Sequence, residues 1–336
     1  MADTFLAIIM KPYRFGGFAV VLILSLLVPM VRAASLHEEL SALSETEGLG
    51  LATFQGKGKL GVIYFDKRGA NGTLDFKDLT GLYDVEPLHE MILGANDGPT
   101  KYGGVVPSHL VSMNLALFSL MGGLPVATGI HAWPRAAALS PGGGKVAALF
   151  IYGGGHKISL QADLINWEDP VEVYSVPLGG EAQATAYKAE NFSWAPDNFR
   201  LVYSLEGRIS VFNTRTHTSQ FLVDGSDPDW SPDGKFIAFR SADHGLATYE
   251  VGSQKVRRFM TGPGEVVGYP RWSPDSKYLF FTRYAVWLAA RNPLTMPVTD
   301  FVVLAVQDGT STVVFTPGMG EDNRRYHWIR TGSPSH

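Results

Sequence analysis

The stretch DPDWSPDGKFIAFRSADHG, Asp227–Gly245, joins a tryptophan, a four-residue turn and an apolar strand in that order. Ser231-Pro232-Asp233-Gly234 satisfies the position rules of a type I turn, since Ser bonds its own backbone, Pro fixes φ and Gly relaxes the fourth position. The segment that follows, Lys235–Phe239, is apolar on both alternating faces. A strand of this kind must be covered on both sides. The stretch therefore predicts a hairpin buried between layers of an all-β domain.

The same order of residues recurs along the chain. WSPDSKYLFF (272–281) and WAPDNFRLVY (194–203) are close copies, and LSPGGGKVAALF (139–150) is a weaker one. The four turn prolines are separated by 55, 36 and 42 residues. The residues that define the repeat and are assigned a structural role are Pro141, Trp194, Pro196, Asp197, Trp230, Ser231, Pro232, Asp233, Gly234, Trp272, Ser273, Pro274 and Asp275.

Each copy is followed by a strand, a polar turn and another strand, as in RISVFNTRTHTSQFLV and LATYEVGSQKVRRFM. Two further versions of this second element lie upstream, where the tryptophan and the turn have faded. A period of about 40 residues with four strands per unit is typical of a β-propeller, in which neighbouring sheets bury both faces of each blade. The sequence therefore predicts an all-β propeller, most simply of six four-stranded blades, with seven blades as the alternative.

At these residues the chain resembles the TolB-like, or PD40, branch of WD40-like propellers, whose hallmark is P-x-W-S-P-D-G-K-x-I-A-F. The match is close at Asp229–Phe239 and Arg271–Phe281, fair at Ser193–Tyr203 and weak at Leu139–Phe150. The resemblance implies the fold but not the function, because such propellers serve many unrelated activities. TolB itself carries an additional N-terminal α/β domain, so the resemblance is to a stand-alone propeller.

The N-terminal region has the pattern of an export signal. Lys11 and Arg14 precede the uncharged run at residues 15–31, and VRAAS follows with a predicted cleavage after Ala33. Met10 is an alternative start of translation. The expected organisation is a signal peptide or membrane anchor at 1–33, a short helical lead-in at 34–50, a propeller at 51–330 and a tail at 331–336. The folded part is expected outside the cytoplasm, periplasmic or extracellular; an uncleaved helix at 15–31 is the alternative, and would anchor it to the membrane.

Composition excludes several classes of function. The 336 residues carry a formal net charge of -4 and contain no cysteine. The first property offers no basic field for nucleic acid, and the second removes disulfides, cysteine-ligated metals and thiol nucleophiles. The sequence contains no G-x-S-x-G, H-E-x-x-H or P-loop motif, so it indicates no catalytic residue and no cofactor.

Dispersed histidines and acids are the only pointers toward metal chemistry. Four histidines in predicted loops would form a metal site if the propeller brought them to its central funnel: His109, His131, His156 and His244. That arrangement would suit a carbohydrate lyase or hydrolase, which is the alternative function. Unrelated loop positions are the favoured interpretation, and the acidic run from Asp224 to Asp233 is interpreted as turn residues in preference to a calcium loop.

Two insertions lengthen their repeats and are the candidate binding loops. The residues singled out in them are Trp167, Glu168, Asp169, Trp287 and Arg291. Extra loop length on a rigid scaffold often carries binding specificity. The favoured hypothesis is therefore a non-catalytic, exported scaffold that binds a protein or peptide of the cell envelope, with carbohydrate as the alternative ligand.

Overall fold

In the computed structural model, the described part of the chain is one helix followed by twenty-three strands. The residues described are 17–56, 58–65, 71–76, 79–86, 91–96, 114–119, 126–127, 136–141, 145–152, 155–162, 171–178, 192–216, 218–259, 265–285, 298–315 and 326–332. The helix is α2 (Gly17–Glu47). The strands are β1 (Leu49–Gly56), β2 (Lys59–Tyr64), β3 (Asn71–Asp75), β4 (Leu79–Glu86), β5 (Met91–Asn96), β6 (Asn114–Ser119), β7 (Val126–Ala127), β8 (Ala136–Leu139), β9 (Lys145–Tyr152), β10 (Gly155–Ala162), β11 (Val171–Leu178), β12 (Phe192–Trp194), β13 (Arg200–Leu205), β14 (Arg208–Asn213), β15 (Thr218–Trp230), β16 (Phe236–Ser241), β17 (Leu246–Glu250), β18 (Val256–Phe259), β19 (Glu265–Trp272), β20 (Tyr278–Ala285), β21 (Val298–Ala305), β22 (Ser311–Phe315) and β23 (Tyr326–Arg330).

The strands form antiparallel sheets. Four sheets have four strands each, in the orders β23-β1-β2-β3, β4-β5-β6-β7, β8-β9-β10-β11 and β19-β20-β21-β22, and a fifth runs from β12 to β18. The long strand β15 serves both halves of this fifth sheet, since residues 218–224 pair with β14 and residues 225–230 pair with β16. Gly225 stands at the change of partner with φ 157°, and a Cβ there would lie 2.6 Å from the carbonyl oxygen of Arg240. Only glycine fits this crossing from one half to the other.

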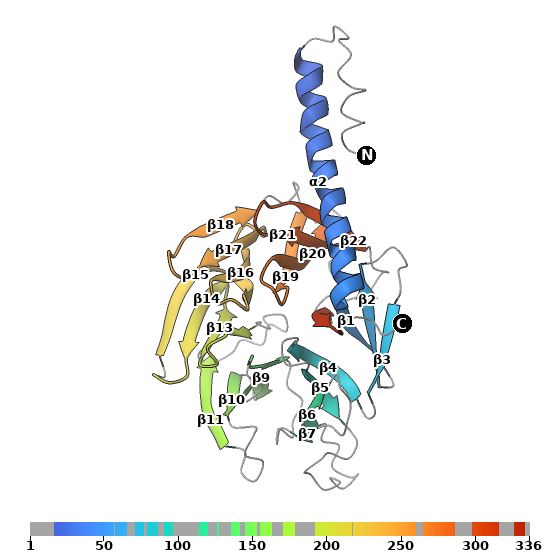
Figure 1. Ribbon diagram of the computed structural model, residues 1–336. Coiled ribbons are helices and arrows are strands. Elements are labelled where there is room, and N and C mark those ends of the chain that lie inside the picture. The colour runs from blue at the N-terminus through green and yellow to red at the C-terminus, as the bar shows by residue number, and fades with distance from the viewer. Residues whose placement is uncertain are drawn as a thin grey trace.

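The sheets are arranged around a common centre (Figure 1). One strand of each four-stranded sheet and two strands of the seven-stranded sheet face that centre, and each contacts the next strand around it. These inner strands follow one another in the order β4, β8, β12, β15, β19 and β23, and β23 contacts β4 again. The described inner strands therefore form a closed ring.

The ring is closed by pairing the two ends of the domain. β23 lies beside β1, with Trp328 opposite Leu51 and Arg330 opposite Leu49. Strands about 280 residues apart in sequence thus share one sheet, so both ends of the domain are held by the same ladder of hydrogen bonds. Closure of this kind completes the first sheet with the last strand, so neither end of the domain is left as a separate unpaired strand.

The turn predicted in the opening stretch is present and is closed by hydrogen bonds. The backbone N–H of Gly234 donates to the carbonyl of Ser231 at 2.9 Å, and the buried hydroxyl of Ser231 accepts from the N–H of Phe236 at 2.9 Å. Ser273 makes the same two kinds of bond in the next copy, with Ser276 and Tyr278. The last turn residue has positive φ in all three strong copies: 63° at Asn198, 76° at Gly234 and 60° at Ser276. The repeat in the sequence therefore corresponds to a repeated backbone conformation.

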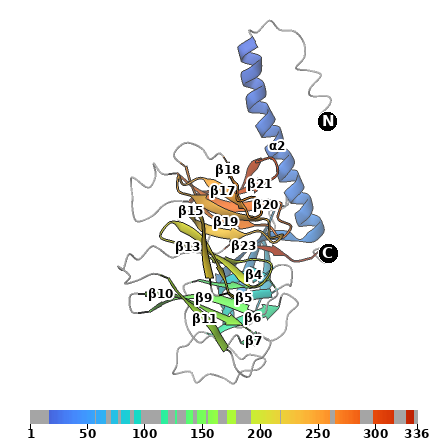
Figure 2. The ribbon, with the colours of Figure 1, turned by 90° about the vertical axis from the view of Figure 1, so that its left-hand side faces the viewer.

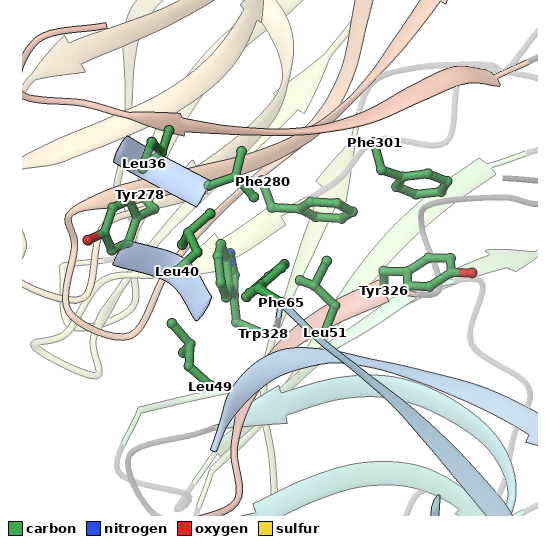
Figure 3. Close-up of a cluster of buried hydrophobic side chains, with 11 residues drawn as sticks. Leu36, Leu40, Leu49, Leu51, Phe65, Tyr278, Phe280, Phe301, Tyr326 and Trp328 are labelled. Atoms are coloured by element: carbon green, nitrogen blue, oxygen red, sulfur yellow. The ribbon is translucent and has the colours of Figure 1, made fainter. Parts of the chain in front are cut away.

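The helix α2 packs with its C-terminal half against the closing sheet and its neighbour (Figure 3). Leu36 and Leu40 lie in a buried cluster with Phe65, Tyr278 and Trp328. Burying each leucine contributes about 1.5–3 kcal/mol. Farther along, the hydroxyl of Ser44 accepts from the N–H of Phe65 at 2.9 Å and donates to the carbonyl of Leu49 at 2.6 Å. These bonds fix the passage from helix to first strand.

The other half of α2 extends beyond the sheets (Figures 1 and 2). Met30 is 70% exposed and Val31 is 67% exposed, whereas Leu36 is 3% exposed. Contact with the sheets therefore begins between Val31 and Leu36. Among the residues whose side chains are described, no helical segment is long and apolar enough to cross a membrane.

Candidate functional site

One position recurs at the centre of the ring, immediately before the tryptophan of each repeat or the residue that replaces it. We call the residues at this position the central ring. They are Asp84, Ala138, Ser193, Asp229, Arg271 and His327, on β4, β8, β12, β15, β19 and β23. Because these strands meet around the centre, successive members that are 36 to 56 positions apart in sequence become neighbours, and so do Asp84 and His327, which are 243 positions apart.

Three side chains of the central ring accept hydrogen bonds from the backbone of the next inner strand. Asp84 Oδ2 accepts from Leu139 N at 2.8 Å, Ser193 Oγ from Trp230 N at 3.1 Å, and Asp229 Oδ2 from Trp272 N at 2.8 Å. An inner strand has no ladder partner on its central side, so its amides need acceptors there. The ring side chains supply them and couple one sheet to the next.

Three tryptophans return this coupling in the opposite direction. Their indole N–H groups donate to carbonyls of ring residues in the preceding sheet: Trp194 to Ala138 at 3.2 Å, Trp272 to Asp229 at 3.1 Å and Trp328 to Arg271 at 3.0 Å. A buried indole needs such a partner, and here the partner lies across the boundary between two sheets. At these three positions the tryptophan therefore connects neighbouring sheets as well as filling the core. The indole of Trp230 donates instead to the carbonyl of Gly234 in its own turn, at 3.3 Å.

Irregularities in the inner strands direct the charged ring residues toward their partners. The register shifts between Leu82 and Asp84 in β4, between Ser226 and Asp229 in β15, and between Gly268 and Arg271 in β19. In the last two strands the shift includes a residue of positive φ, 54° at Asp227 and 48° at Tyr269. A bulge turns the following side chain away from the regular alternation of a strand.

The ionisable side chains of the central ring form two close pairs. Arg271 Nη1 lies 3.5 Å from Asp229 Oδ1, and His327 Nδ1 lies 3.5 Å from Asp84 Oδ1. Both oxygens of each carboxylate therefore have partners, because Oδ2 of each accepts from a backbone amide. Asp84 Oδ1 also accepts from the neighbouring Val85 N at 2.9 Å. The imidazole Nε2 of His327 is buried without a hydrogen-bond partner in the described part of the chain.

Burial dominates the electrostatics of Asp229. It raises the pKa of this carboxyl above the ordinary value of 3.8, against the opposing effects of Arg271, the Trp272 amide and Ser193. The negative charge of Asp84 raises the pKa further, which places the two carboxylates within electrostatic reach of each other. Two acids, an arginine and a histidine thus share one poorly solvated centre.

A second ion pair lies beside the ring on the β15–β16 pair. Arg240 Nη2 lies 3.3 Å from Oδ2 of Asp227, whose side chain is 6% exposed, and Arg240 Nε donates to Ser226 Oγ at 2.8 Å. Asp227 therefore accepts a charge-assisted interaction from within its own sheet, whereas Asp229 bonds the next sheet. The two acids of the DPD sequence have separate structural roles.

Comparison with known proteins identifies the fold. A structure assigned as TolB from Agrobacterium tumefaciens aligns over 84% of this chain and 97% of its own, with 15% identity and a TM-score of 0.54.

The chain has a TolB-like β-propeller fold.

Two more distant propeller alignments have TM-scores of 0.48. One is TolB from Acinetobacter baumannii, with 14% identity over 82% of this chain and 70% of that one. The other is a nidogen/laminin complex, with 11% identity over 84% of this chain and 97% of that one. No family model matches the sequence, and no curated protein is significantly similar to it.

Most of the site residues predicted from the sequence lie outside the described part of the chain. His109, His131, Trp167, Glu168, Asp169, Trp287 and Arg291 lie outside the described residues. His156 lies on β10, and His244 occupies a turn between β16 and β17 with φ 69°. The described residues contain no group of three or more histidine or acidic side chains placed to hold a metal ion.

The acidic run from Asp224 to Asp233 does not converge on one point. Asp224 pairs with Arg208 in the β14–β15 ladder, Asp227 faces Arg240, Asp229 belongs to the central ring and Asp233 lies in the turn. Each is explained by its own local structure. The interpretation of Asp233 as a turn residue agrees with its bond from Ser231 Oγ at 2.7 Å.

The central ring is the feature that sequence reasoning missed. Asp84 and His327 belong to repeats in which the tryptophan motif is incomplete, and the histidine hypothesis did not include His327. A signal was available, because the residue before each motif tryptophan is the same structural position. Lining up Ser193, Asp229 and Arg271 would have shown a polar residue at that position in each strong copy.

Proposed function

We propose that this chain is an exported, non-catalytic scaffold that binds a protein or peptide partner in the cell envelope. The observation that carries the proposal is the engagement of the central carboxylates. Asp84 and Asp229 use both oxygens for backbone amides and for His327 and Arg271, at distances of 2.8–3.5 Å. Acids committed in this way hold blades together, which favours a rigid platform over a reactive centre.

The scaffold has six four-stranded blades in this proposal. The six inner strands of the described ring support that number, with β15 contributing its second half to one blade and its first half to the blade before it. Each inner strand is followed by three further strands, and the closing blade takes three of its strands from the beginning of the domain. Membership of the PD40 branch rests on the repeated W-S-P-D turn.

Export is proposed to end in cleavage after Ala33. The helix supports this position, since Leu36 is the first buried residue among the described side chains and both Met30 and Val31 are exposed. Removal of residues 1–33 would therefore leave the packing of α2 intact. N-terminal sequencing of the protein from an envelope fraction tests the point: Ala34 as first residue supports cleavage, and an intact N-terminus supports the membrane anchor.

Partner binding is proposed to use the loops that carry Trp167, Glu168 and Asp169 in one blade and Trp287 and Arg291 in another. A photo-crosslinking amino acid placed at Trp167 or Trp287 of the full chain, in the cells that produce it, tests this directly. Phe221 is the matched control, because it is an exposed aromatic residue on the outer half of β15. We expect a discrete protein adduct from a loop position and none from the control.

Metal analysis of the same purified protein separates the scaffold from an enzyme. If the chain is a scaffold, the amount of bound metal should not change when the four candidate histidines are replaced. Stoichiometric metal that disappears when His109, His131, His156 and His244 are replaced by alanine, together with no adduct at any position, would overturn the proposal in favour of a metal-dependent carbohydrate lyase or hydrolase.

A further inference from the structure

One of the three strong turns departs from the other two in residue order. After the common aspartate and left-handed residue, the turns following Trp230 and Trp272 continue with a lysine and then an aromatic residue. The turn following Trp194 reverses these types, with Phe199 first and Arg200 second. The structure shows what each exchanged residue does.

Arg200 occupies the place of the aromatic residue. In the next turn, Phe236 stacks on Trp272 of the following blade, with ring centroids 6.1 Å apart and 26° between planes. Arg200 lies over Trp230 of its own following blade in the same way, with Cζ 5.0 Å from the ring centroid. A cation over an indole face replaces an aromatic stack, so the contact between blades is kept.

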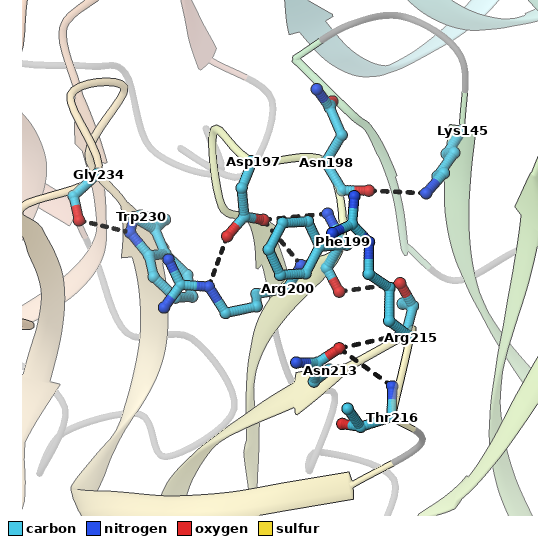
Figure 4. Close-up of polar contacts among 11 residues, drawn as sticks. Lys145, Asp197, Asn198, Phe199, Arg200, Asn213, Arg215, Thr216, Trp230 and Gly234 are labelled. Carbon is cyan, nitrogen blue, oxygen red and sulfur yellow. Dashed lines mark hydrogen bonds and ion pairs between the residues drawn. The ribbon is translucent and has the colours of Figure 1, made fainter.

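Phe199 consequently takes the position at which the other turns carry an exposed lysine, and its side chain is half-buried there (Figure 4). Arg215 covers its ring at 4.0 Å from the centroid, and Arg200 lies 5.9 Å from the same centroid. Its backbone is held in place, since the carbonyl of Phe199 accepts from both the N–H and the hydroxyl of Thr214 at 2.8 and 2.9 Å. The aromatic ring and its flanking arginines are therefore fixed on two hydrogen-bonded turns.

Among the described residues, positive side chains outnumber negative ones around this turn. Lys145 Nζ reaches in from the preceding blade and donates to the carbonyl of Asn198 at 2.8 Å. In the described part of the chain, Lys145, Arg200 and Arg215 are thus three cations about this turn, and Asp197 is the carboxylate paired with one of them, in a protein of net charge -4. The equivalent lysines of the other two turns each lie near the aspartate of their own turn, Lys235 at 3.2 Å from Asp233 and Lys277 at 3.8 Å from Asp275.

We propose that Lys145, Phe199, Arg200 and Arg215, which we call the Phe199 patch, bind an acidic segment of a partner protein. Guanidinium groups pair with carboxylates through two parallel N–H donors, and the phenyl ring offers apolar contact between them. Fixed turns reduce the loss of side-chain freedom on binding. An anionic membrane surface is disfavoured, because the whole chain is acidic and the patch is one cluster of three cations.

The strand register places Lys145 of this patch beside the strand end at which the connection containing Trp167 begins. β10 ends at Ala162, which pairs with Lys145 on one side and with Val171 on the other, so the connection that contains Trp167 leaves the sheet next to Lys145. The connection that contains Trp287 follows the end of β20 at Ala285, opposite to the end that adjoins the turn. The inference rests on the proposed scaffold function and, of the two candidate loops, selects the one whose flanking strand ends adjoin Lys145.

Exchanging Phe199 and Arg200, the two residues whose order differs from that of the other turns, tests the proposal. The variant Phe199→Lys/Arg200→Phe gives this turn the residue order of the other two, so it is expected to fold, with an unchanged urea midpoint as the check. The probes are a fluorescent peptide with glutamates on both sides of a leucine pair, and its twin with lysines in place of the glutamates. Fluorescence anisotropy of the full chain at low and high salt gives the affinities.

We expect the glutamate peptide to bind, the lysine peptide to bind at least tenfold more weakly, and salt to weaken the binding. The exchange variant and Arg215→Glu should each lose about tenfold in affinity, equivalent to about 1.4 kcal/mol. Lys277→Glu, on an equivalent turn of another blade, should stay within about twofold. If the exchange variant does not fold, the comparison of Arg215→Glu with Lys277→Glu still decides.

Equal binding of the two peptides, or an Arg215→Glu variant as tight as the parent chain, would overturn the proposal. Binding to phosphatidylglycerol vesicles without binding to the glutamate peptide would overturn it in favour of a lipid surface. Loop adducts from Trp167 or Trp287 that persist in the exchange variant would leave the scaffold function standing while this inference fails. Absence of any adduct together with absence of peptide binding would remove both.

Discussion

The turn after Trp230 and the turn after Trp194 have the same backbone shape but distribute their hydrogen bonds differently. In the first, Ser231 Oγ accepts from Phe236 N and Asp233 Oδ1 accepts from Lys235 N at 3.0 Å. In the second, Ala195 replaces the serine, and Asp197 Oδ1 accepts from both amides, Phe199 N and Arg200 N, at 3.0 Å. In the second turn a single carboxylate therefore accepts both hydrogen bonds, which two side chains accept in the first turn.

The difference shows which requirements of the repeat are strict. Each turn must supply acceptors for two amides and must place its last residue at positive φ, since these follow from the backbone. The identity of the acceptor is free to change, provided that another side chain reaches the amide. This freedom lets one copy of a repeat acquire a different surface, as the Phe199 patch illustrates, without losing the turn.

The largest expected effect on stability follows from removing Asp197, the carboxylate that accepts both hydrogen bonds. Asp197→Ala leaves two backbone amides without acceptors and takes the ion pair from Arg200 Nε, 2.5 Å away. We expect a loss of about 3 kcal/mol in the free energy of unfolding, measured by urea denaturation. Asp233→Ala is the matched control and should lose about 1 kcal/mol, because Ser231 still serves one amide. Equal losses would contradict the division of roles.

A smaller effect is expected from exchanging the hydroxyl between the two turns. Ser231→Ala removes the acceptor of Phe236 N at a position with no solvent exposure, and we expect a loss of about 2 kcal/mol. The reverse change, Ala195→Ser, adds a hydroxyl where Asp197 already satisfies both amides. It should alter stability by less than about 0.5 kcal/mol. A large gain from Ala195→Ser would mean that the carboxylate satisfies the turn poorly.

These turns also mark how far the sequence alone could lead. The residues W-S-P-D determine the turn locally, through φ at proline and the bonds of serine and aspartate, so their repetition predicted the propeller. The central ring depends on which strands become neighbours after closure. Asp84 and His327 are 243 positions apart in sequence, and no local rule relates them. The exchanged pair at Phe199 and Arg200 was visible in the sequence, but its consequence required the position of Trp230 in the following blade.

The conformation of the last turn residue gives a weaker test of the shared backbone. Gly234→Ala places a Cβ at φ 76° and 3.0 Å from Pro196 Cγ, so we expect a loss of about 1 kcal/mol. At the equivalent position Asn198 already has a side chain at φ 63°. Asn198→Gly should therefore stabilise the fold by up to about 1 kcal/mol. Urea midpoints that move in the same direction for both variants would contradict equivalent conformations.

The smallest expected effect concerns the acid dependence of the serine-containing turn. Burial raises the pKa of Asp233, but hydrogen bonds from Ser231 and the Lys235 amide, together with the Lys235 charge, bring it below its ordinary value of 3.8. A carboxyl with a lowered folded-state pKa stabilises the fold above its unfolded-state pKa, and this contribution disappears as the pH falls through the folded-state value. The stability difference between the parent chain and Asp233→Asn should accordingly shrink between pH 5 and about pH 2. Gly234→Ala, whose strain involves no proton, should keep a constant difference over the same range, and a parallel decline in both variants would assign the acid sensitivity to another part of the propeller.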